Sequence, residues 1–327
     1  MLRNLILILV SFCFIHIAQA WGFWAHQRIN RLAIFSLPPA MFTFYKANIE
    51  YITEHAVDPD KRRYVVVGEA PKHFIDLDHF CAYPCDSFPR KWQEAKSIYS
   101  EDTLNAYGIV PWVIEWTMNK LTGAFVDKDK ALILKYSADL GHYIADSHVP
   151  LHTTENYNGQ LTDQQGIHGF WESRLPELFH EEYSFWVGGA SYIKNRNEFI
   201  WTNILHAHNQ LEGVLSLEKQ LDKTYPNDQK YAFEARGESL IKTYSRGYSL
   251  AYHILLDGMV ENQMQLSVKH IADLWFTCWV GAGLPNLSDL DFNNIREPAG
   301  QENEGKVLKI KSRPHAETGF DVLLDKP

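Results

Sequence analysis

Histidines and carboxylates recur four residues apart in this chain. His142 is followed by Asp146 and His168 by Glu172, and His152 lies between the two pairs. Residues four apart lie on one face of a helix, and zinc in proteins is bound by imidazole nitrogens and carboxylate oxygens. A single pair of this kind is more often an ion pair on a helix surface. Two pairs with a third histidine between them predict a metal site.

The first 20 residues have the organisation of a secretory signal peptide. Arg3 precedes an apolar run, and Ala18-Gln19-Ala20 is a small-x-small cleavage site. The apolar run is short for a membrane span, so an uncleaved membrane anchor is the less favoured alternative. We therefore expect an exported protein, periplasmic or secreted, whose mature chain begins at Trp21.

Further candidate ligands lie near this new N-terminus. Cleavage would give Trp21 a free α-amino group, which is a nitrogen ligand, and His26 follows five residues later. Asp58 and His73 lie in the segments AVDPDK and HFID. Taken alone, Asp58 would equally suit a turn before Pro59, and His73 a polar group satisfied by hydrogen bonds. Trp21 and His26 are therefore further candidate metal ligands, and the residues alone leave the roles of Asp58 and His73 open.

The overall charge excludes a general electrostatic attraction to polyanions. The chain carries 31 basic and 40 acidic residues, a net charge of −9 at pH 7. Such a chain has no overall field that attracts nucleic acid or anionic membranes. If the protein acts on a phosphate ester, the positive charge must be local, and bound metal ions could supply it.

The cysteines predict a small loop and a buried thiol. Cys81 and Cys85 are separated by three residues that include Pro84, so they could close a small surface loop in an oxidising compartment. Cys278 lies in the apolar run LWFTCWV and is expected to be a buried free thiol. The sequence has no CxxC zinc motif, so a metal ion would have to be held by histidines and carboxylates.

These side chains must be positioned by helices, because most of the mature chain has helical periodicity. The predicted helices cover residues 25–36, 39–55, 90–125 with a break around 108–111, 129–149, 191–222, 230–256 and 259–280. Residues 153–166 read as a polar loop, and only Tyr64 to Val67 resembles a strand. The expected organisation is a signal peptide (1–20), one all-α domain (21–290) and a polar tail (291–327).

Five segments, in this order after a signal peptide, carry a resemblance to a known superfamily. They are WGFWAH, AVDPDK, HFID, GHYIADSHVPLH and GIHGFWE. This set resembles the zinc-dependent phosphodiesterases that include the S1/P1-type nucleases and the bacterial zinc phospholipases C. The resemblance covers Trp21 to about Glu172, roughly half of the chain. It implies an all-α fold of the phospholipase C/P1 nuclease type and a metal-dependent hydrolase acting on phosphate ester bonds.

The resemblance also implies three zinc ions with distinct ligand sets. The sets are Asp58, His73, His142 and Asp146 for the first ion, His152, His168 and Glu172 for the second, and Trp21, His26 and the shared Asp146 for the third. Asp58 is preferred to Asp60 because its spacing of 15 residues to His73 agrees with the nucleases. A metal-activated water is the implied nucleophile, which makes Asp58 and Asp146 catalytic residues.

The substrate is less sharply indicated. In the nucleases, the residue at the position of Lys61 contacts phosphate. The aromatic residue at the position of Phe74 stacks on a base, and the aspartate at the position of Asp76 recognises that base. By this resemblance we expect a single-strand nuclease or 3′-nucleotidase acting on single-stranded nucleic acid or nucleotides, with no protein partner. Lys61 would equally suit a solvated position, and Phe74 the core.

Two alternatives stay open. A phospholipase C acting on phospholipid head groups is the first, because Glu172 replaces the aspartate usual in the nucleases and QGIHGFWE is closer to the phospholipase motif. The second is a non-catalytic zinc-binding exported protein.

Overall fold

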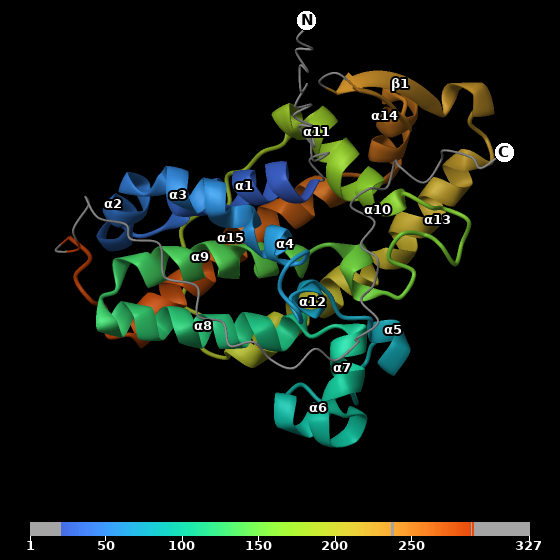
Figure 1. Ribbon diagram of the computed structural model, residues 1–327. Helices are drawn as coiled ribbons and strands as arrows, with labels where there is room; N and C mark the ends of the chain where they lie inside the picture. The colour runs from blue at the N-terminus through green and yellow to red at the C-terminus, as the bar shows by residue number, and fades with distance from the viewer. Residues whose placement is uncertain (1–20, 237–238, 289, 291–327) are drawn as a thin grey trace, which may run out of the picture.

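The computed structural model describes residues 21–236, 239–288 and 290. The expected signal peptide and the polar tail from residue 291 lie outside these described residues. Within them the chain is mostly helical, as its periodicity predicts (Figure 1). No helix in the described part of the chain has both the length and the apolar character needed to cross a bilayer.

Helices supply almost all of the regular structure. The α-helices are α1 (Trp21–Ala33), α2 (Pro39–Ala47), α3 (Ile49–Glu54), α4 (Asp58–Arg62), α5 (Leu77–Phe80), α6 (Trp92–Tyr99), α7 (Glu101–Tyr107), α8 (Val110–Asp127), α9 (Lys130–Asp146), α10 (Ile167–Gly169), α11 (Leu175–Phe179), α12 (Arg196–Asn209), α13 (Leu211–Asp222), α14 (Arg246–Leu255) and α15 (Met259–Gly281). Short 3₁₀ turns are η1 (Ile34–Ser36), η2 (His55–Val57), η3 (Ala70–His73), η4 (Pro150–Thr153), η6 (His180–Glu182) and η7 (Asn227–Gln229), and η5 (Phe170–Arg174) is a π-helical turn. The strands are β1 (Tyr231–Arg236) and β2 (Ser239–Tyr244).

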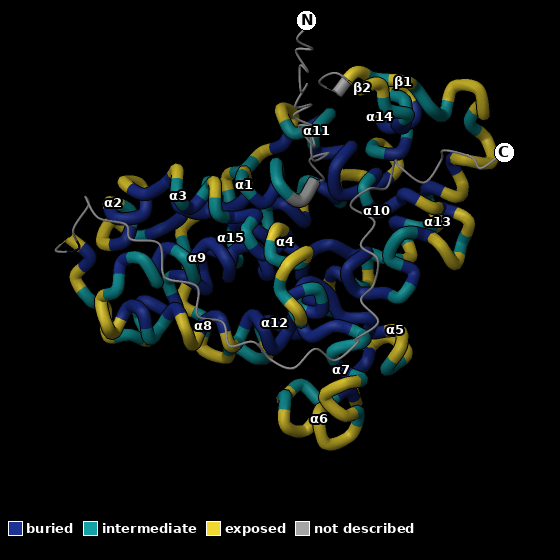
Figure 2. The backbone as a smooth tube through the Cα atoms, in the orientation of Figure 1, coloured by how far each residue is buried: buried dark blue, intermediate teal, exposed yellow. Residues whose placement is uncertain are grey.

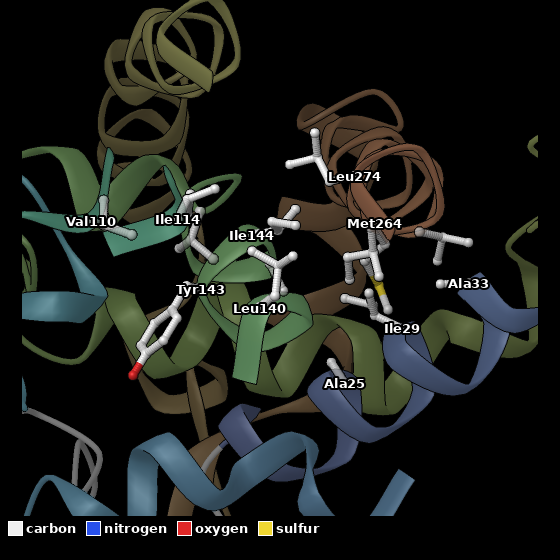
Figure 3. Packing of buried hydrophobic residues seen from close by; sticks show 14 of the residues in the cluster. Ala25, Ile29, Ala33, Val110, Ile114, Leu140, Tyr143, Ile144, Met264 and Leu274 are labelled. Atoms are coloured by element: carbon white, nitrogen blue, oxygen red, sulfur yellow. The ribbon is translucent and has the colours of Figure 1, made fainter. Parts of the chain in front are cut away.

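Helix α9 lies at the centre of the fold. Its residues 137–146 are all buried, and the helix packs against α1, α8 and α15 (Figure 2). Figure 3 shows Leu140 and Ile144 of α9 packing with Ile29 of α1 and Met264 of α15. Because this helix has no face left for solvent, each polar side chain on its C-terminal half needs a partner inside the protein.

A glycine lets α1 approach α9 closely. A Cβ atom at Gly141 would lie 2.1 Å from Oδ1 of Asn30, and Nδ2 of Asn30 donates a hydrogen bond to the carbonyl oxygen of Ala138 at 3.1 Å. A larger residue at position 141 would therefore push the helices apart. The close approach brings the rings of His26 and His142 into stacking contact, with centroids 3.9 Å apart.

The predicted helix over 230–256 is wrong in its first half. Residues 231–236 and 239–244 form the antiparallel strands β1 and β2, and only 246–255 are helical, as α14. Contacts from a distant segment hold the strands: Nη1 of Arg174 donates to Glu234 at 2.7 Å, and the ring of Phe170 stacks on Tyr244 with centroids 3.9 Å apart. Local periodicity carries no information about such contacts.

The predicted strand at residues 64–67 is also wrong, because these residues form a turn after α4. The backbone N–H groups of Val65 and Val66 both donate to the carbonyl oxygen of Arg62, at 2.9 and 2.7 Å. The apolar pattern that resembled a strand belongs to an exposed turn with Tyr64, Val65 and Val67 at its surface.

The remaining expectations for the secondary structure are confirmed within small shifts. The 90–125 prediction resolves into α6, α7 and α8, with the break at Gly108, and residues 154–166 form a loop between η4 and α10. Cys81 and Cys85 are joined by a disulfide, and Cys278 is a buried free thiol.

Candidate metal centre

Four side chains from three segments converge at the end of α9. His142 and Asp146 lie one turn apart on α9, His73 ends η3, and Asp60 lies on α4. Nδ1 of His73 is 2.9 Å from Oδ2 of Asp146 and 3.0 Å from Nε2 of His142. Oδ1 of Asp60 is 3.5 Å from Nε2 of His142 and 3.6 Å from Nδ1 of His73. All four residues are buried, so they form one group of potential ligands.

The structure places Asp60, and not the predicted Asp58, in this group. Residues two apart on a helix point about 200° away from each other, so only one of these two aspartates can face α9. Oδ2 of Asp58 instead lies 2.5 Å from Nδ1 of His55, and its Oδ1 accepts a hydrogen bond from Lys61 at 3.1 Å near the surface. The structure therefore groups Asp60, and not the predicted Asp58, with His73 and His142 as a potential metal ligand.

His26 joins the group from the side of α1. Its Nε2 lies 3.3 Å from Oδ1 of Asp146, while Oδ2 of the same carboxylate faces His73 and His142. The two oxygens of Asp146 thus face two different sets of histidines. Helix α1 begins at Trp21; the side chain of Trp21 lies outside the described residues, and no contact tests its predicted role as a ligand.

His152, His168 and Glu172 form a second buried group, as the sequence predicts. Nε2 of His168 is 3.0 Å from Nε2 of His152 and 2.9 Å from Oε2 of Glu172, and Nε2 of His152 is 3.5 Å from the same oxygen. Glu172 lies on the π-helical turn η5, a backbone form that is frequent at functional sites.

The two groups are neighbours. Nδ1 of His152 donates a hydrogen bond to the backbone carbonyl oxygen of His73 at 2.7 Å, and the N–H of Ile75 donates to the carbonyl oxygen of His152 at 2.9 Å. Nδ1 of His152 also lies 3.6 Å from Oδ1 of Asp146. These contacts join the segment of His73, which belongs to the first group, to the segment of His152 in the second.

Backbone acceptors orient the histidines for metal binding. Nδ1 of His142 donates to the carbonyl oxygen of Ala56 at 2.9 Å, as Nδ1 of His152 does to His73. A nitrogen that donates to a carbonyl carries the ring proton, so Nε2 of each neutral imidazole keeps its lone pair for a metal ion.

The spacing of the ligand atoms fits a tetrahedral ion. Ligands about 2.0–2.1 Å from a zinc ion lie about 3.3 Å from one another at the corners of a tetrahedron. The distances within both groups range from 2.9 to 3.6 Å. The Nε2 atoms of His152 and His168 face each other, and a metal ion between them would be bound by the lone pairs of both nitrogens. These buried groups can therefore hold metal ions.

Charge within the groups is balanced between carboxylates and imidazoles. Burial opposes an imidazolium, but the carboxylates of Asp146 and Asp60 outweigh it and raise the pKa of His142 to about 10. Burial lowers the pKa of His73 to about 4. Burial would raise the pKa of Glu172, yet its two histidine neighbours lower it to about 2. The carboxylates are thus ionised at neutral pH, and the imidazole of His142 holds a proton that a metal ion must displace.

We therefore expect the binding of a divalent metal ion to this group at pH 7 to release about one proton or more per protein molecule. His142 has a folded-state pKa above its ordinary value of 6.5, so its ion pairs stabilise the metal-free protein fully below pH 6.5, and that stabilisation disappears as the pH rises through about 10. Calorimetric titration with zinc in two buffers of different ionisation enthalpy measures the released protons. Equal binding enthalpies in both buffers would contradict the protonated His142.

The predicted substrate residues lie in different environments. Lys61 is exposed and pairs with Asp58. Phe74 is only 2% exposed, and a Cβ atom at Gly108 would lie 2.5 Å from its ring; a ring packed this way has no free face for a base. Asp76 is also buried, and its N–H donates to the carbonyl oxygen of Tyr107 at 2.7 Å.

Sequence reasoning missed a buried carboxylate behind His73. Glu69 is fully buried, accepts hydrogen bonds from the hydroxyl of Tyr143 and from Lys72, and has Oε1 3.9 Å from Nε2 of His73. Arg62 lies beside Glu69 and pairs with Asp139 at 3.1 Å. A signal was available, because Glu69 and His73 repeat the four-residue spacing of the other pairs.

Comparison with known proteins leaves the family of the chain open. No family model matches it, and no curated protein matches it. Its function is therefore inferred from the motifs and from the ligand geometry described above.

Proposed function

We propose that this chain is an exported zinc-dependent phosphodiester hydrolase of the phospholipase C/P1 nuclease type. The observation that carries the proposal is the pair of adjacent buried groups of histidines and carboxylates, one of which contains Asp146 with its two oxygens facing different histidines. Nitrogen and oxygen ligands at tetrahedral spacing suit zinc. Three ions follow if the α-amino group of a cleaved chain joins His26 and Asp146.

The residues that would hold the ions fall into three sets. They are Asp60, His73, His142 and Asp146, then His152, His168 and Glu172, then Trp21, His26 and the shared Asp146. Zinc bound there supplies Lewis acidity and lowers the pKa of a coordinated water towards 7, the chemistry that hydrolysis of a phosphodiester requires. Asp146 ties two sets together, and the carbonyl oxygens of Ala56 and His73 keep His142 and His152 in the tautomer that ligation needs.

A cavity whose wall includes His208, which contacts the residue after His152, favours a nucleotide substrate. It has a volume of about 460 Å³ and is lined by Tyr83, Gln164, His208 and Lys219, among others. Nδ1 of His208 is 2.9 Å from the hydroxyl of Thr153, the residue after His152. Aromatic rings at such a cavity provide stacking surfaces for bases of any identity. We therefore assign to Tyr83 and His208 the stacking role that buried Phe74 does not provide.

The exposed apolar turn at residues 64–67 favours the second candidate, a phospholipase C. This turn lies between Asp60 and His73 in the chain, and Arg63 at its base pairs with Asp60 at 3.1 Å. A phospholipid head group reaches an enzyme only at a membrane surface, where exposed apolar side chains are useful. Both substrates are phosphodiesters, so the proposed chemistry is common to both.

Product analysis tests the proposed function and separates the two substrates. Zinc-loaded mature protein starting at Trp21 is incubated with a single-stranded oligonucleotide or with phosphatidylcholine vesicles, each with a chelator-treated control. We expect zinc-dependent release of 5′-mononucleotides from the oligonucleotide. Release of phosphocholine alone would identify a phospholipase, and no hydrolysis of either substrate by fully zinc-loaded protein would contradict the proposed function.

A residue added before Trp21 is expected to remove one zinc ion per molecule. It converts the α-amino group into an amide, which is a poor metal ligand, while His26 and Asp146 stay in place. Metal analysis should give about two ions instead of three, and hydrolysis should fall by about tenfold or more. Unchanged zinc content in the extended protein would show that the terminal amine is not a ligand.

A further inference from the structure

The two ring nitrogens of His73 have different surroundings. Nδ1 faces the first ligand group, 2.9 Å from Oδ2 of Asp146 and 3.0 Å from Nε2 of His142. Nε2 lies on the other side of the ring and has no hydrogen-bond partner in the described part of the chain, although His73 is fully buried. Buried polar atoms nearly always have a partner, so the absence of one at Nε2 requires an explanation.

The carboxylate of Glu69 faces this nitrogen. Oε1 of Glu69 is 3.9 Å from Nε2 of His73, and Glu69 is itself fully buried. Glu69 directly precedes the turn η3, which ends at His73, so the turn itself brings the two side chains together. A movement of about 1 Å would bring the two atoms within hydrogen-bonding distance.

Three donors hold the carboxylate of Glu69 in place. Nζ of Lys72 donates to Oε2 at 2.6 Å, and the hydroxyl of Tyr143 donates to Oε1. Nη2 of Arg62 lies 3.5 Å from Oε1. Figure 3 shows the hydroxyl of Tyr143 pointing away from Leu140 and the apolar cluster. Because an ionised carboxylate offers about four lone-pair sites, Glu69 can accept one more hydrogen bond.

His73 differs from His142 and His152 in the nitrogen that faces its ligand group. Nδ1 of His142 and Nδ1 of His152 each donate to a backbone carbonyl oxygen, which leaves Nε2 for a metal ion. In His73 it is Nδ1 that faces the other ligands, so a neutral His73 that binds an ion carries its ring proton on Nε2. A carboxylate accepts a hydrogen bond from this N–H more strongly than a neutral carbonyl does, and it makes the ring a more basic ligand.

We propose that Glu69 is the positioning residue of His73. It accepts a hydrogen bond from the Nε2–H group and so keeps the lone pair of Nδ1 directed at the ion of the first group. The inference rests on the proposed function only in requiring that a zinc ion binds beside His73; neither the substrate nor hydrolysis enters it.

The zinc affinity of a Glu69→Gln variant tests the inference. Glutamine keeps the size of the side chain but removes its charge, so competition with a chelator should show zinc binding to the first group weakened about 10- to 100-fold. The ion of the second group should be retained. The matched control is Asp139→Asn, which removes the charge of another buried carboxylate that pairs with Arg62. It should bind zinc within about threefold of the wild type, and thermal unfolding of the metal-free proteins checks that both variants fold.

The position of the ring proton is a second readout, which a purely structural role of Glu69 would not affect. Long-range ¹H–¹⁵N spectra of zinc-loaded protein with ¹⁵N-labelled histidine should show the proton of His73 on Nε2 and those of His142 and His152 on Nδ1. The Nε2–H resonance of His73 should move to lower chemical shift in Glu69→Gln and stay in place in Asp139→Asn. A proton on Nδ1 of His73 in the zinc-loaded wild type would overturn the proposal, even if Glu69→Gln did not fold.

Further outcomes separate this inference from the proposed function. Hydrolysis by the wild type, together with unchanged zinc affinity in Glu69→Gln, overturns the role of Glu69 and leaves the proposed function. The expected ring proton and the weakened zinc binding, without hydrolysis of either substrate by the wild type, support the role of Glu69 and contradict the proposed function.

Discussion

Replacement of Asp146 by asparagine is expected to lower kcat/KM for phosphodiester hydrolysis by at least about 100-fold and to reduce the zinc content by at least one ion per molecule. Oδ2 of Asp146 faces His73 and His142, and its Oδ1 faces His26. Asparagine keeps the shape of the side chain but removes its charge and turns one oxygen into an amide nitrogen, which cannot be a ligand. Both neighbouring sets therefore lose a donor at once.

The control for this variant is Asp127→Asn at the exposed end of α8, which removes a carboxylate far from the ligand groups in the chain. It should retain full zinc content and activity. Mass spectrometry of metal content and steady-state kinetics on the same preparations provide the two readouts. Full activity and full zinc content of Asp146→Asn would contradict the role proposed for Asp146, whereas no hydrolysis by the zinc-loaded wild type would support a protein that binds zinc without catalysis.

Asp60→Asn and Asp58→Asn are expected to differ sharply, although they lie two residues apart. Asp60 is buried within 3.6 Å of two ring nitrogens, so its loss should weaken zinc binding to the first group by about 100-fold or more. Asp58 only pairs with His55 and Lys61 near the surface, so its replacement should change the free energy of unfolding by less than about 1 kcal/mol and leave zinc affinity unaltered.

Competition with a chelator measures the zinc affinity of both variants. Because Asp60 also pairs with Arg63, whose side chain is only 4% exposed, thermal unfolding of the metal-free proteins must be recorded to separate lost folding from lost binding. If Asp58→Asn lost the ion and Asp60→Asn kept it, the assignment drawn from motif spacing would be right and the one drawn from the structure wrong.

Much of the candidate centre could be predicted because its pairs are local. His142 with Asp146 and His168 with Glu172 need only one helical turn to come together, and the structure brings each pair within hydrogen-bonding range. Which of Asp58 and Asp60 faces the other ligands could not be predicted from residues one helical turn apart. It depends on the rotation of the short helix α4 against α9, and a spacing counted along the chain does not contain that rotation.

The two errors in secondary structure have related causes. Residues 231–236 and 239–244 pair as strands because Arg174 and Phe170 contact them from a segment about 60 residues earlier. Residues 64–67 have an apolar pattern typical of a strand, but the pairs of Arg62 and Arg63 at their base hold them in an exposed turn. In both places long-range contacts outweighed local preference.

The amino-acid sequence by itself determined the helical character of the chain, the four-residue pairs of histidine and carboxylate, the loop closed by Cys81 and Cys85 and the buried thiol of Cys278. All of these follow from neighbours within about one helical turn. The tertiary structure alone decided which aspartate faces α9, that both oxygens of Asp146 are engaged, and that Tyr64 and its neighbours face solvent. Those outcomes depend on how helices distant in sequence rotate and pack against one another, because burial and facing contacts arise only when separate segments meet.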